Sequence, residues 1–268
     1  MGVGYFDAKL VIDNYDWVQF SRLLVPTICI SVFCSLTHFM LCTMKSPPFT
    51  FAYNITLSVW LAFAISLGPQ SIYSTNIQPY SVTPVEYDSI DFGWFINAVL
   101  SGIGQVFFAP DFVSSLIILG GVCLASPLIA LFAFSGSFIA TGIAVITHSA
   151  KTGIEFGLDG YSSVLAAIAL GGFYFVPSWG SFLYLIVGSV FCVPMRRVFQ
   201  SLFIHPFGPA LTFPFCLVAS IMYLASLSTK WPRLVDKQFL SFPERHLIPS
   251  PTVNKNDSHT NLELINSA

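Results

Sequence analysis

Charged residues are scarce in this sequence. Asp, Glu, Lys and Arg make up 9% of the 268 residues, whereas an average protein carries about 25%. A soluble domain could not cover its surface with so few charges. Hydrophobic residues reach 54%, and Phe alone contributes 27 residues. The composition therefore predicts an all-α membrane protein that crosses the bilayer several times.

Several chemical signatures are also missing. The chain has no basic stripe for nucleic acid, and its net charge is only −2. His38, His148 and His205 are scattered near expected helix ends and form no ligand set. The cysteines lack metal-like spacing and are interpreted as small buried residues; they are Cys29, Cys34, Cys42, Cys123, Cys192 and Cys216. The sequence therefore predicts no cofactor, no metal and no enzymatic activity.

Apolar segments of roughly membrane-spanning length follow one another along the chain. They cover 18–43, 49–67, 112–126, 127–148, 161–176, 180–204 and 209–228. Residues 68–93 contain no Lys or Arg, whereas the tail after 228 contains Lys230, Arg233, Lys237, Arg245 and Lys255. Because positive residues favour the cytoplasmic side, we expect the tail inside and the 68–93 loop outside. The polar composition from about 241 onward predicts disorder.

Segment 94–109, WFINAVLSGIGQVFFA, differs from the other apolar segments. It is short for a span, carries Gly102 and Gly104 in its middle, and includes the polar Asn97 and Gln105. Broken backbone at membrane depth is tolerated only where it is buried in protein or lines a cavity. We interpret the segment as a re-entrant helix, and an amphipathic entry helix remains the alternative.

The end of the chain repeats its beginning. SPPFTFAYNITLS at 46–58 aligns with GPALTFPFCLVAS at 208–220 at an offset of 162 residues. The matched pairs are Pro47 with Pro209, Thr50 with Thr212, Phe51 with Phe213 and Ser58 with Ser220. The expected topology gives the two copies opposite orientations, so the pattern predicts an inverted repeat, which is typical of membrane transporters.

These segments resemble a known family. SGIGQVFFAPDFVSSLIILGGVCLASPLIAL at 101–131 resembles the pore-helix region of urea transporters, and GLDGYSSVLAAIALGGFYF at 157–175 is similar to their glycine–aromatic segment. GPALTFPF at 208–215 resembles their Leu-Pro-x-x-Thr-x-Pro-Phe signature, and SPPFTFAY at 46–53 looks like a degraded copy of it. The resemblance runs from about residue 1 to residue 245.

The resemblance implies a fold and a set of pore residues. Family members have two inverted halves, each with five spans and a re-entrant helix, and usually form trimers with one pore per subunit. The pore residues implied here are Gln105, Phe107, Phe108, Leu165, Thr50 and Thr212. Backbone carbonyls, a Gln amide and Thr hydroxyls can replace the water around urea, and aromatic faces can reject ions. The implied function is passive passage of urea through the bilayer.

The chain also departs from the family pattern. Residues 1–70 are interpreted as a remnant of the first repeat, 71–93 as an extracellular linker, 94–229 as a complete second repeat, and 230–268 as a cytoplasmic tail, most simply at the plasma membrane. This division predicts about seven spans plus one re-entrant helix, with the first half truncated. The alternative function is a non-conducting subunit that modulates the assembly of full-length urea transporters.

Three charged residues stand within otherwise apolar sequence. Asp159 replaces an aromatic residue of the family, and Arg196 and Arg197 lie inside 180–204. An intramembrane aspartyl protease would need a second facing carboxylate, and no other apolar segment contains an Asp. Charges within a membrane are costly and often functional. For the two arginines we expect side chains that extend to the outer interface.

Overall fold

The computed structural model describes residues 28, 31–39, 47–66, 91–203, 210–236 and 240–247. Within these ranges the regular structure is helical, apart from isolated bridge residues such as the antiparallel pair Phe175 and Leu234. The helices are α3 (Phe51–Ser66), α4 (Phe92–Gly104), η2 (Gln105–Phe107), α5 (Phe112–Ala125), α6 (Pro127–Ile146), α7 (Lys151–Glu155), α8 (Tyr161–Ile168), η3 (Ala169–Phe173), α9 (Trp179–Phe203), α10 (Phe213–Thr229) and α11 (Pro243–His246). The helical fold class predicted from composition is confirmed.

Among the residues that the structure describes, two helices are long and apolar enough to cross a membrane, and a bent pair adds a third candidate. They are α6 with 20 residues and α9 with 25 residues, and the pair joins α4 to α5. Shorter apolar helices are formed by Tyr161–Phe173 and Phe213–Thr229. These lengths fit a membrane protein. The count of seven spans stays a prediction, and most of segment 18–43 lies outside the described residues.

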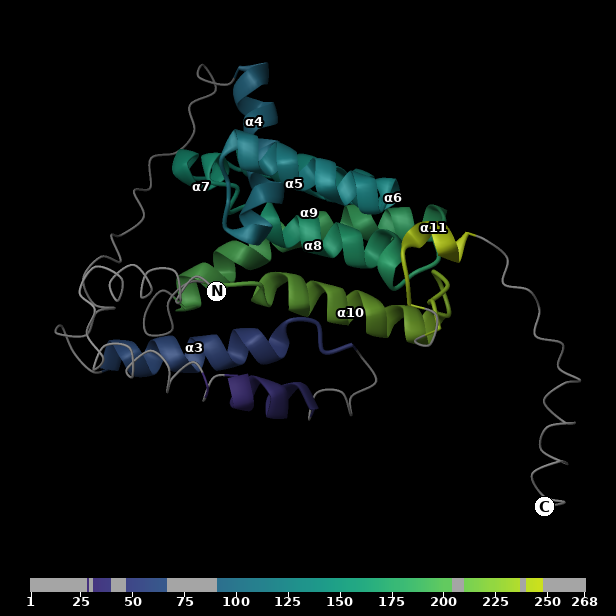
Figure 1. Cartoon of the computed structure of the whole chain (residues 1–268), viewed down its shortest axis with the longest axis horizontal. Coiled ribbons are helices and arrows are strands. Elements are labelled where there is room, and N and C mark those ends of the chain that lie inside the picture. Colours follow the sequence, from purple (N-terminus) through teal and green to yellow (C-terminus); the bar gives the residue numbers. More distant parts are fainter. Residues whose placement is uncertain are drawn as a thin grey trace, which may run out of the picture.

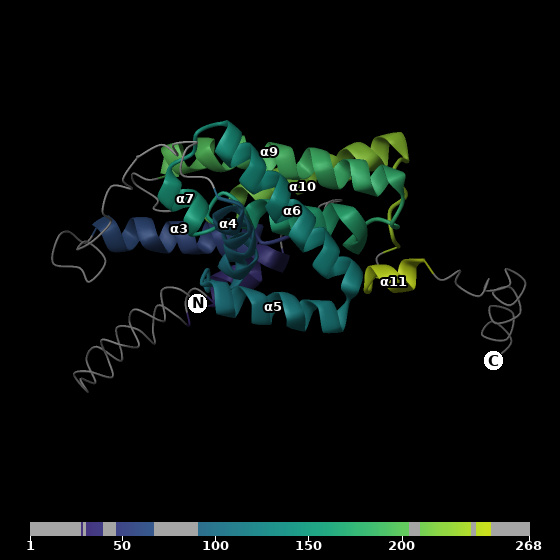
Figure 2. The ribbon, with the colours of Figure 1, turned by 90° about the horizontal axis from the view of Figure 1, so that it is seen from above.

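Helices α6, α8, α9 and α10 pack side by side and contain most of the core (Figure 1). Helix α4 runs across this bundle, and Figure 2 shows it nearly end-on. The central cluster joins Leu170, Phe175, Phe215 and Tyr223. Small residues permit this close packing, because helices in lipid associate through backbone proximity rather than through the hydrophobic effect.

The second half of α4 is buried without interruption. Every residue from Ala98 to Gly104 is buried, which excludes an amphipathic helix lying on the surface. The chain then forms the turn η2, and Phe108 adopts a left-handed conformation with φ of 59°. A bend of 71° leads into α5. This geometry fits a re-entrant loop or a broken span, so the re-entrant placement stays a prediction.

Glycine is required where α4 crosses its neighbours. A Cβ at Gly102 would overlap the hydroxyl of Ser137, and at Gly104 it would overlap the carbonyl of Ala109. A backbone hydrogen bond closes the turn, because the N–H of Ala109 donates to the carbonyl of Gly104 at 3.1 Å. The glycines of the GIGQ segment therefore fix the position of the turn that carries Gln105.

The segment after α10 is partly folded, contrary to the disorder predicted from about residue 241. Pro243 is buried, and Glu244 accepts hydrogen bonds from the Ser126 hydroxyl at 2.7 Å and the Leu128 N–H at 3.0 Å. His246 contacts the carbonyl of Gly172 at 3.0 Å. The polar composition was misleading because a single carboxylate caps the first turn of α6. Residues 248–268 lie outside the described residues.

Candidate functional site

The two threonines of the sequence repeat meet in space. Their Oγ1 atoms lie 2.7 Å apart, which is a hydrogen-bond distance between Thr50 and Thr212. Thr50 directly precedes α3 and Thr212 directly precedes α10. From this contact the two helices extend in opposite directions, as Figures 1 and 2 show from two sides. The two threonines that the repeat pairs in sequence therefore lie together at two helix starts.

The backbone before each threonine has the same conformation. Phe49 and Leu211 both adopt left-handed φ values, 46° and 47°. The N–H that follows each threonine donates three residues back, from Phe51 to Pro48 at 3.1 Å and from Phe213 to Ala210 at 3.3 Å. The repeat in the sequence is therefore also a repeat of local structure. Such φ values favour glycine, yet the two positions are occupied by Phe49 and Leu211.

Two further side chains join the threonines in a ring of four, which we call the Thr–Asn–Cys ring. Asn54 Oδ1 accepts from Thr212 Oγ1 at 2.8 Å, and Asn54 Nδ2 donates to Cys216 Sγ at 3.5 Å. The Cys216 thiol in turn lies 3.0 Å from Thr50 Oγ1. Asn54 and Cys216 are 0% exposed. All four positions are related by the 162-residue offset, since Asn54 pairs with Cys216 as Thr50 pairs with Thr212.

Sequence reasoning missed two members of this ring. The sequence analysis did not single out Asn54, and it interpreted Cys216 only as a small buried residue. The repeat offset carried the missing signal, because it places both residues one helical turn beyond the matched threonines. The view of cysteines as buried residues holds for Cys192 and Cys216 but is wrong for Cys123, which is exposed.

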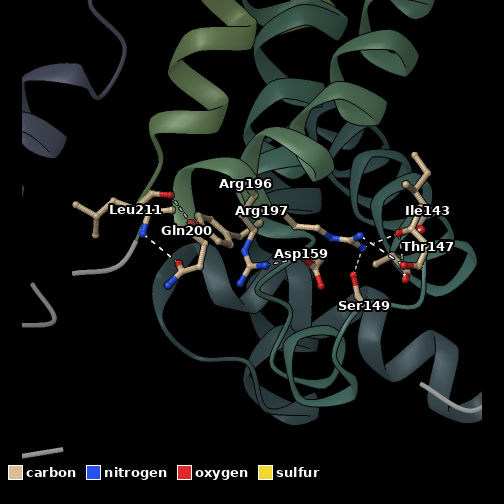
Figure 3. Close-up of polar contacts among 11 residues, drawn as sticks. Ile143, Thr147, Ser149, Asp159, Arg196, Arg197, Gln200 and Leu211 are labelled. Atoms are coloured by element: carbon tan, nitrogen blue, oxygen red, sulfur yellow. Dashed lines mark hydrogen bonds and ion pairs between the residues drawn. The ribbon is translucent and has the colours of Figure 1, made fainter. Parts of the chain in front are cut away.

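Side chains of the helical bundle hold the backbone directly before Thr212. Gln200 on α9 accepts a hydrogen bond from the N–H of Ala210 at 3.2 Å. The hydroxyl of Tyr161, at the start of α8, donates to the carbonyl of Leu211. Figure 3 shows Gln200 and Leu211 on one side of this polar region. Two helices therefore fix the residues directly before the threonine, including the left-handed Leu211.

The two adjacent arginines of α9 point to different partners (Figure 3). Arg196 is 8% exposed and donates to Asp159 at 2.7 Å, and Asp159 is 4% exposed. Arg197 donates to the hydroxyl of Thr147 at 2.6 Å and to the hydroxyl of Ser149. The expectation that both arginines reach toward the interface is therefore wrong for Arg196. Its charge is compensated inside the protein by the carboxylate of Asp159, which lies 37 residues away in the sequence.

The remaining predicted pore residues lie on α8 and at the η2 turn, which packs against α8. Leu165 packs against the central cluster, as do Phe49 and Phe51, the residues on either side of Thr50. Gln105, Phe107 and Phe108 belong to the η2 turn, where the neighbouring Val106 packs near Val164. Phe107 and Phe108 are 62% and 59% exposed. Helix α8 packs against both the η2 turn and α10, and it therefore connects Gln105 with the ring.

Aromatic rings contact Phe213, the residue that follows the second threonine. The rings of Phe199 and Phe213 stack with centroids 5.8 Å apart, and Phe51 meets Phe213 at 6.4 Å. The Phe199–Phe213 spacing is that of rings in direct contact. Three aromatic rings therefore meet at the residue after Thr212. The sequence analysis named Phe51 and Phe213 as a pair of the repeat but did not single out Phe199.

Comparisons with known proteins point to one family. The model of the urea transporter family matches residues 7–227. Urea transporter 1 of Ovis aries is 26% identical over 238 residues, covering 88% of this chain and 61% of the relative. Urea transporter 1 of Mus musculus is 26% identical over 225 residues, covering 83% of this chain and 57% of the relative. The chain thus spans less than two thirds of the length of these relatives.

Proposed function

Because the chain belongs to the urea transporter family, we propose that it lets urea cross a membrane passively through a narrow, selective pore. The observation that carries the proposal is the contact between Thr50 and Thr212 at the starts of α3 and α10. Inverted repeats bring equivalent positions together near the midplane, where transporters place their substrate sites. The sheep and mouse relatives bear the name urea transporter 1.

The proposed pore uses the residues expected from the family pattern. Thr50 and Thr212 offer hydroxyls, Leu165 contributes an apolar wall, and Gln105 contributes a side-chain amide at the η2 turn. Phe107 and Phe108, both more than half exposed, would confine a flat solute beside that amide. Urea is small, planar and neutral, so it needs hydrogen-bond partners in place of water and no charge compensation.

Helix ends give the site a means of rejecting cations. The N-termini of α3 and α10 converge at the threonines, and each helix start carries a partial positive charge. An ammonium or sodium ion at this point would face two positive helix ends in a region of low polarity. A neutral amide meets no such barrier, which supports selectivity for urea over cations.

The proposal includes an arrangement in the membrane. We assign opposite orientations to α3 and α10, about seven spans and one re-entrant helix, and a trimeric assembly as in the family pattern. Lys230 and Arg233, directly beyond α10, favour a cytoplasmic position for the tail. The plasma membrane is the proposed location, and urea and the lipid bilayer are the proposed partners.

The test is urea flux into vesicles that contain the purified chain, measured by light scattering after rapid mixing. The wild-type chain should conduct urea above the level of empty vesicles. Thr212→Val should lower flux about tenfold, because an unmade hydrogen bond costs roughly 1–3 kcal/mol and 1.4 kcal/mol is a factor of ten. Thr56→Val is the matched control, since Thr56 bonds only within α3, to the carbonyl of Ala52 at 2.7 Å.

A wild-type chain without urea flux would refute the conducting monomer. If that chain then copurified with a full-length relative and changed its assembly, the non-conducting subunit would be the better account. The comparison requires equal insertion of all variants, measured by protease accessibility of the tail.

A further inference from the structure

We propose that Asn54 sets the selectivity of the site by turning both threonine hydroxyls into hydrogen-bond acceptors for the solute. The proposal rests on the urea-transport function above and deepens it. It names the preferred substrate class as small planar amides rich in N–H donors. Asn54 itself is fully buried, so it acts on the solute through the threonines and is a positioning residue.

The first step is the orientation of the Asn54 amide. Its oxygen lies 2.8 Å from Thr212 Oγ1 and 3.4 Å from the backbone nitrogen of Thr212. A backbone N–H can only donate, so the group facing it must be the carbonyl oxygen rather than the NH₂ group. The NH₂ group then faces Cys216 Sγ at 3.5 Å. The backbone of α10 therefore fixes which way the amide points.

The second step follows the hydrogens around the Thr–Asn–Cys ring. The amide oxygen can only accept, so Thr212 gives its one hydroxyl hydrogen to Asn54. In the 2.7 Å contact between the threonines, Thr50 must then be the donor. Thr50 has no second hydrogen for Cys216, so the thiol donates to Thr50 across 3.0 Å. Each donor in the ring has one assigned acceptor, and the cycle closes at the NH₂ group of Asn54.

The third step concerns what remains for a solute. Both hydroxyl hydrogens are used inside the ring, while each hydroxyl oxygen keeps a lone pair. Thr50 and Thr212 are only half-buried, unlike Asn54 and Cys216. A solute beside them therefore meets acceptors and no hydroxyl donor. Urea has N–H groups on both sides of its carbonyl and satisfies such a surface better than an amide with one NH₂ group.

A purely structural role is the competing interpretation. A closed ring of hydrogen bonds stabilises a contact between two helix starts whatever its direction. The two interpretations differ in one respect: only a directed ring predicts that losing Asn54 changes which solutes pass, rather than only how well the protein folds.

The experiment compares urea with acetamide, in which a methyl group replaces one NH₂ of urea at nearly the same size. We expect wild type to conduct urea about tenfold faster than acetamide, the rate equivalent of one unmade hydrogen bond. Asn54→Leu frees the Thr212 hydroxyl to donate, so the urea-to-acetamide ratio should fall close to one. Thr56→Val, a buried change in the same helix, should keep the wild-type ratio.

Cys216→Ala provides the sharper comparison. It removes a ring member, but Thr212 still donates to Asn54 and Thr50 still donates to Thr212. The urea-to-acetamide ratio should therefore stay near the wild-type value, whatever the rate. The proposal would be overturned if the urea-to-acetamide ratio stayed unchanged in Asn54→Leu. It would also be overturned if this ratio fell equally in Asn54→Leu and Cys216→Ala. Either result would leave the proposed urea transport intact. Absence of wild-type flux would overturn the proposed function and this inference together.

A spectroscopic measurement covers the case in which Asn54→Leu does not fold. The infrared S–H stretch of Cys216, isolated as the difference from Cys216→Ala, should lie at the lowered frequency of a donating thiol. Thr50→Val removes the acceptor and should raise that frequency. A Cys216 stretch at the frequency of a free thiol in wild type would contradict the directed ring.

Discussion

At the scale of single residues, the polar groups inside this apolar bundle explain the site. Burying a polar group without a partner is costly, and Asn54, Asp159 and Arg196 are all buried with partners. The repeat offset was enough to predict the Thr50–Thr212 contact from sequence. The Arg196–Asp159 pair could not be predicted, because its members are 37 residues apart and no sequence pattern joins them.

The buried ion pair yields a stability prediction. Arg196→Gln should lower the free energy of unfolding by roughly 3–5 kcal/mol, because it leaves the Asp159 carboxylate buried and unpaired. Arg197→Gln should cost about 1 kcal/mol or less, since that side chain bonds neutral groups in a more exposed position. Thermal unfolding in one detergent, followed by circular dichroism, measures both. Equal destabilisation by the two variants would contradict the role assigned to Asp159.

Gln105 yields a prediction about flux. Gln105→Leu removes a polar side chain from the η2 turn, and urea passage should fall about tenfold or more for one lost hydrogen bond. Asn97→Leu is the matched control, because Asn97 is an exposed amide on α4, before the buried stretch that leads to the η2 turn. Vesicle flux with verified insertion measures the effect. If Gln105→Leu conducts as wild type does, the η2 turn does not line the pore.

Phe107 should act differently from Gln105. Phe107→Ala enlarges the space beside the turn, so the chain should discriminate less among urea analogues of different width while still conducting urea. Flux ratios for urea and methylurea measure this. A ratio identical to that of wild type would remove Phe107 from the pore.

At the scale of elements, the sequence predicted where helices lie better than where they end. The glycines of 94–109 indicated an unusual helix, and the structure ends α4 at Gly104 and bends by 71° into α5. The composition of the tail led to a wrong prediction for 240–247. The tail segment is held by specific contacts, those of Glu244 with the first turn of α6 and of His246 with Gly172, and composition does not record contacts.

The Glu244 contact makes the docking of α11 dependent on pH. Partial desolvation acts to raise the pKa of Glu244, but hydrogen bonds from Leu128 and Ser126 outweigh it and hold the pKa below its usual value of 4.5. Stabilisation by the carboxylate is therefore complete above that value and is lost as the pH falls through the lower folded-state pKa. Amide protection of Leu128 should decrease in that acidic range.

The Glu244→Gln variant isolates this effect. It should weaken amide protection of Leu128 already at neutral pH and remove most of the acidic decrease. Glu155→Gln is the control, because Glu155 bonds Trp94 on the other side of the bundle and not α6. An acidic decrease that persists in Glu244→Gln would assign the titration to another group.

At the scale of the whole molecule, the contact between Thr50 and Thr212 joins the two copies of the repeat. Helices α3 and α10 begin at Thr50 and Thr212, repeat each other's local backbone, and extend in opposite directions (Figure 1). The sequence indicated this arrangement through the 162-residue offset and the asymmetry of charge. The family resemblance indicated urea as the solute. The Thr–Asn–Cys ring could be recognised only in the three-dimensional structure.

The most direct measurement crosslinks this contact while urea flux is recorded. Thr50→Cys and Thr212→Cys are combined in a Cys216→Ala background, because Cys216 lies 3.0 Å from the Thr50 hydroxyl and would compete for the crosslink. The account predicts that a short thiol crosslinker joins the two positions in vesicles, stops urea flux, and releases it again when the link is cleaved. Failure to crosslink in inserted protein, or a complete crosslink that leaves urea flux unchanged, would contradict it.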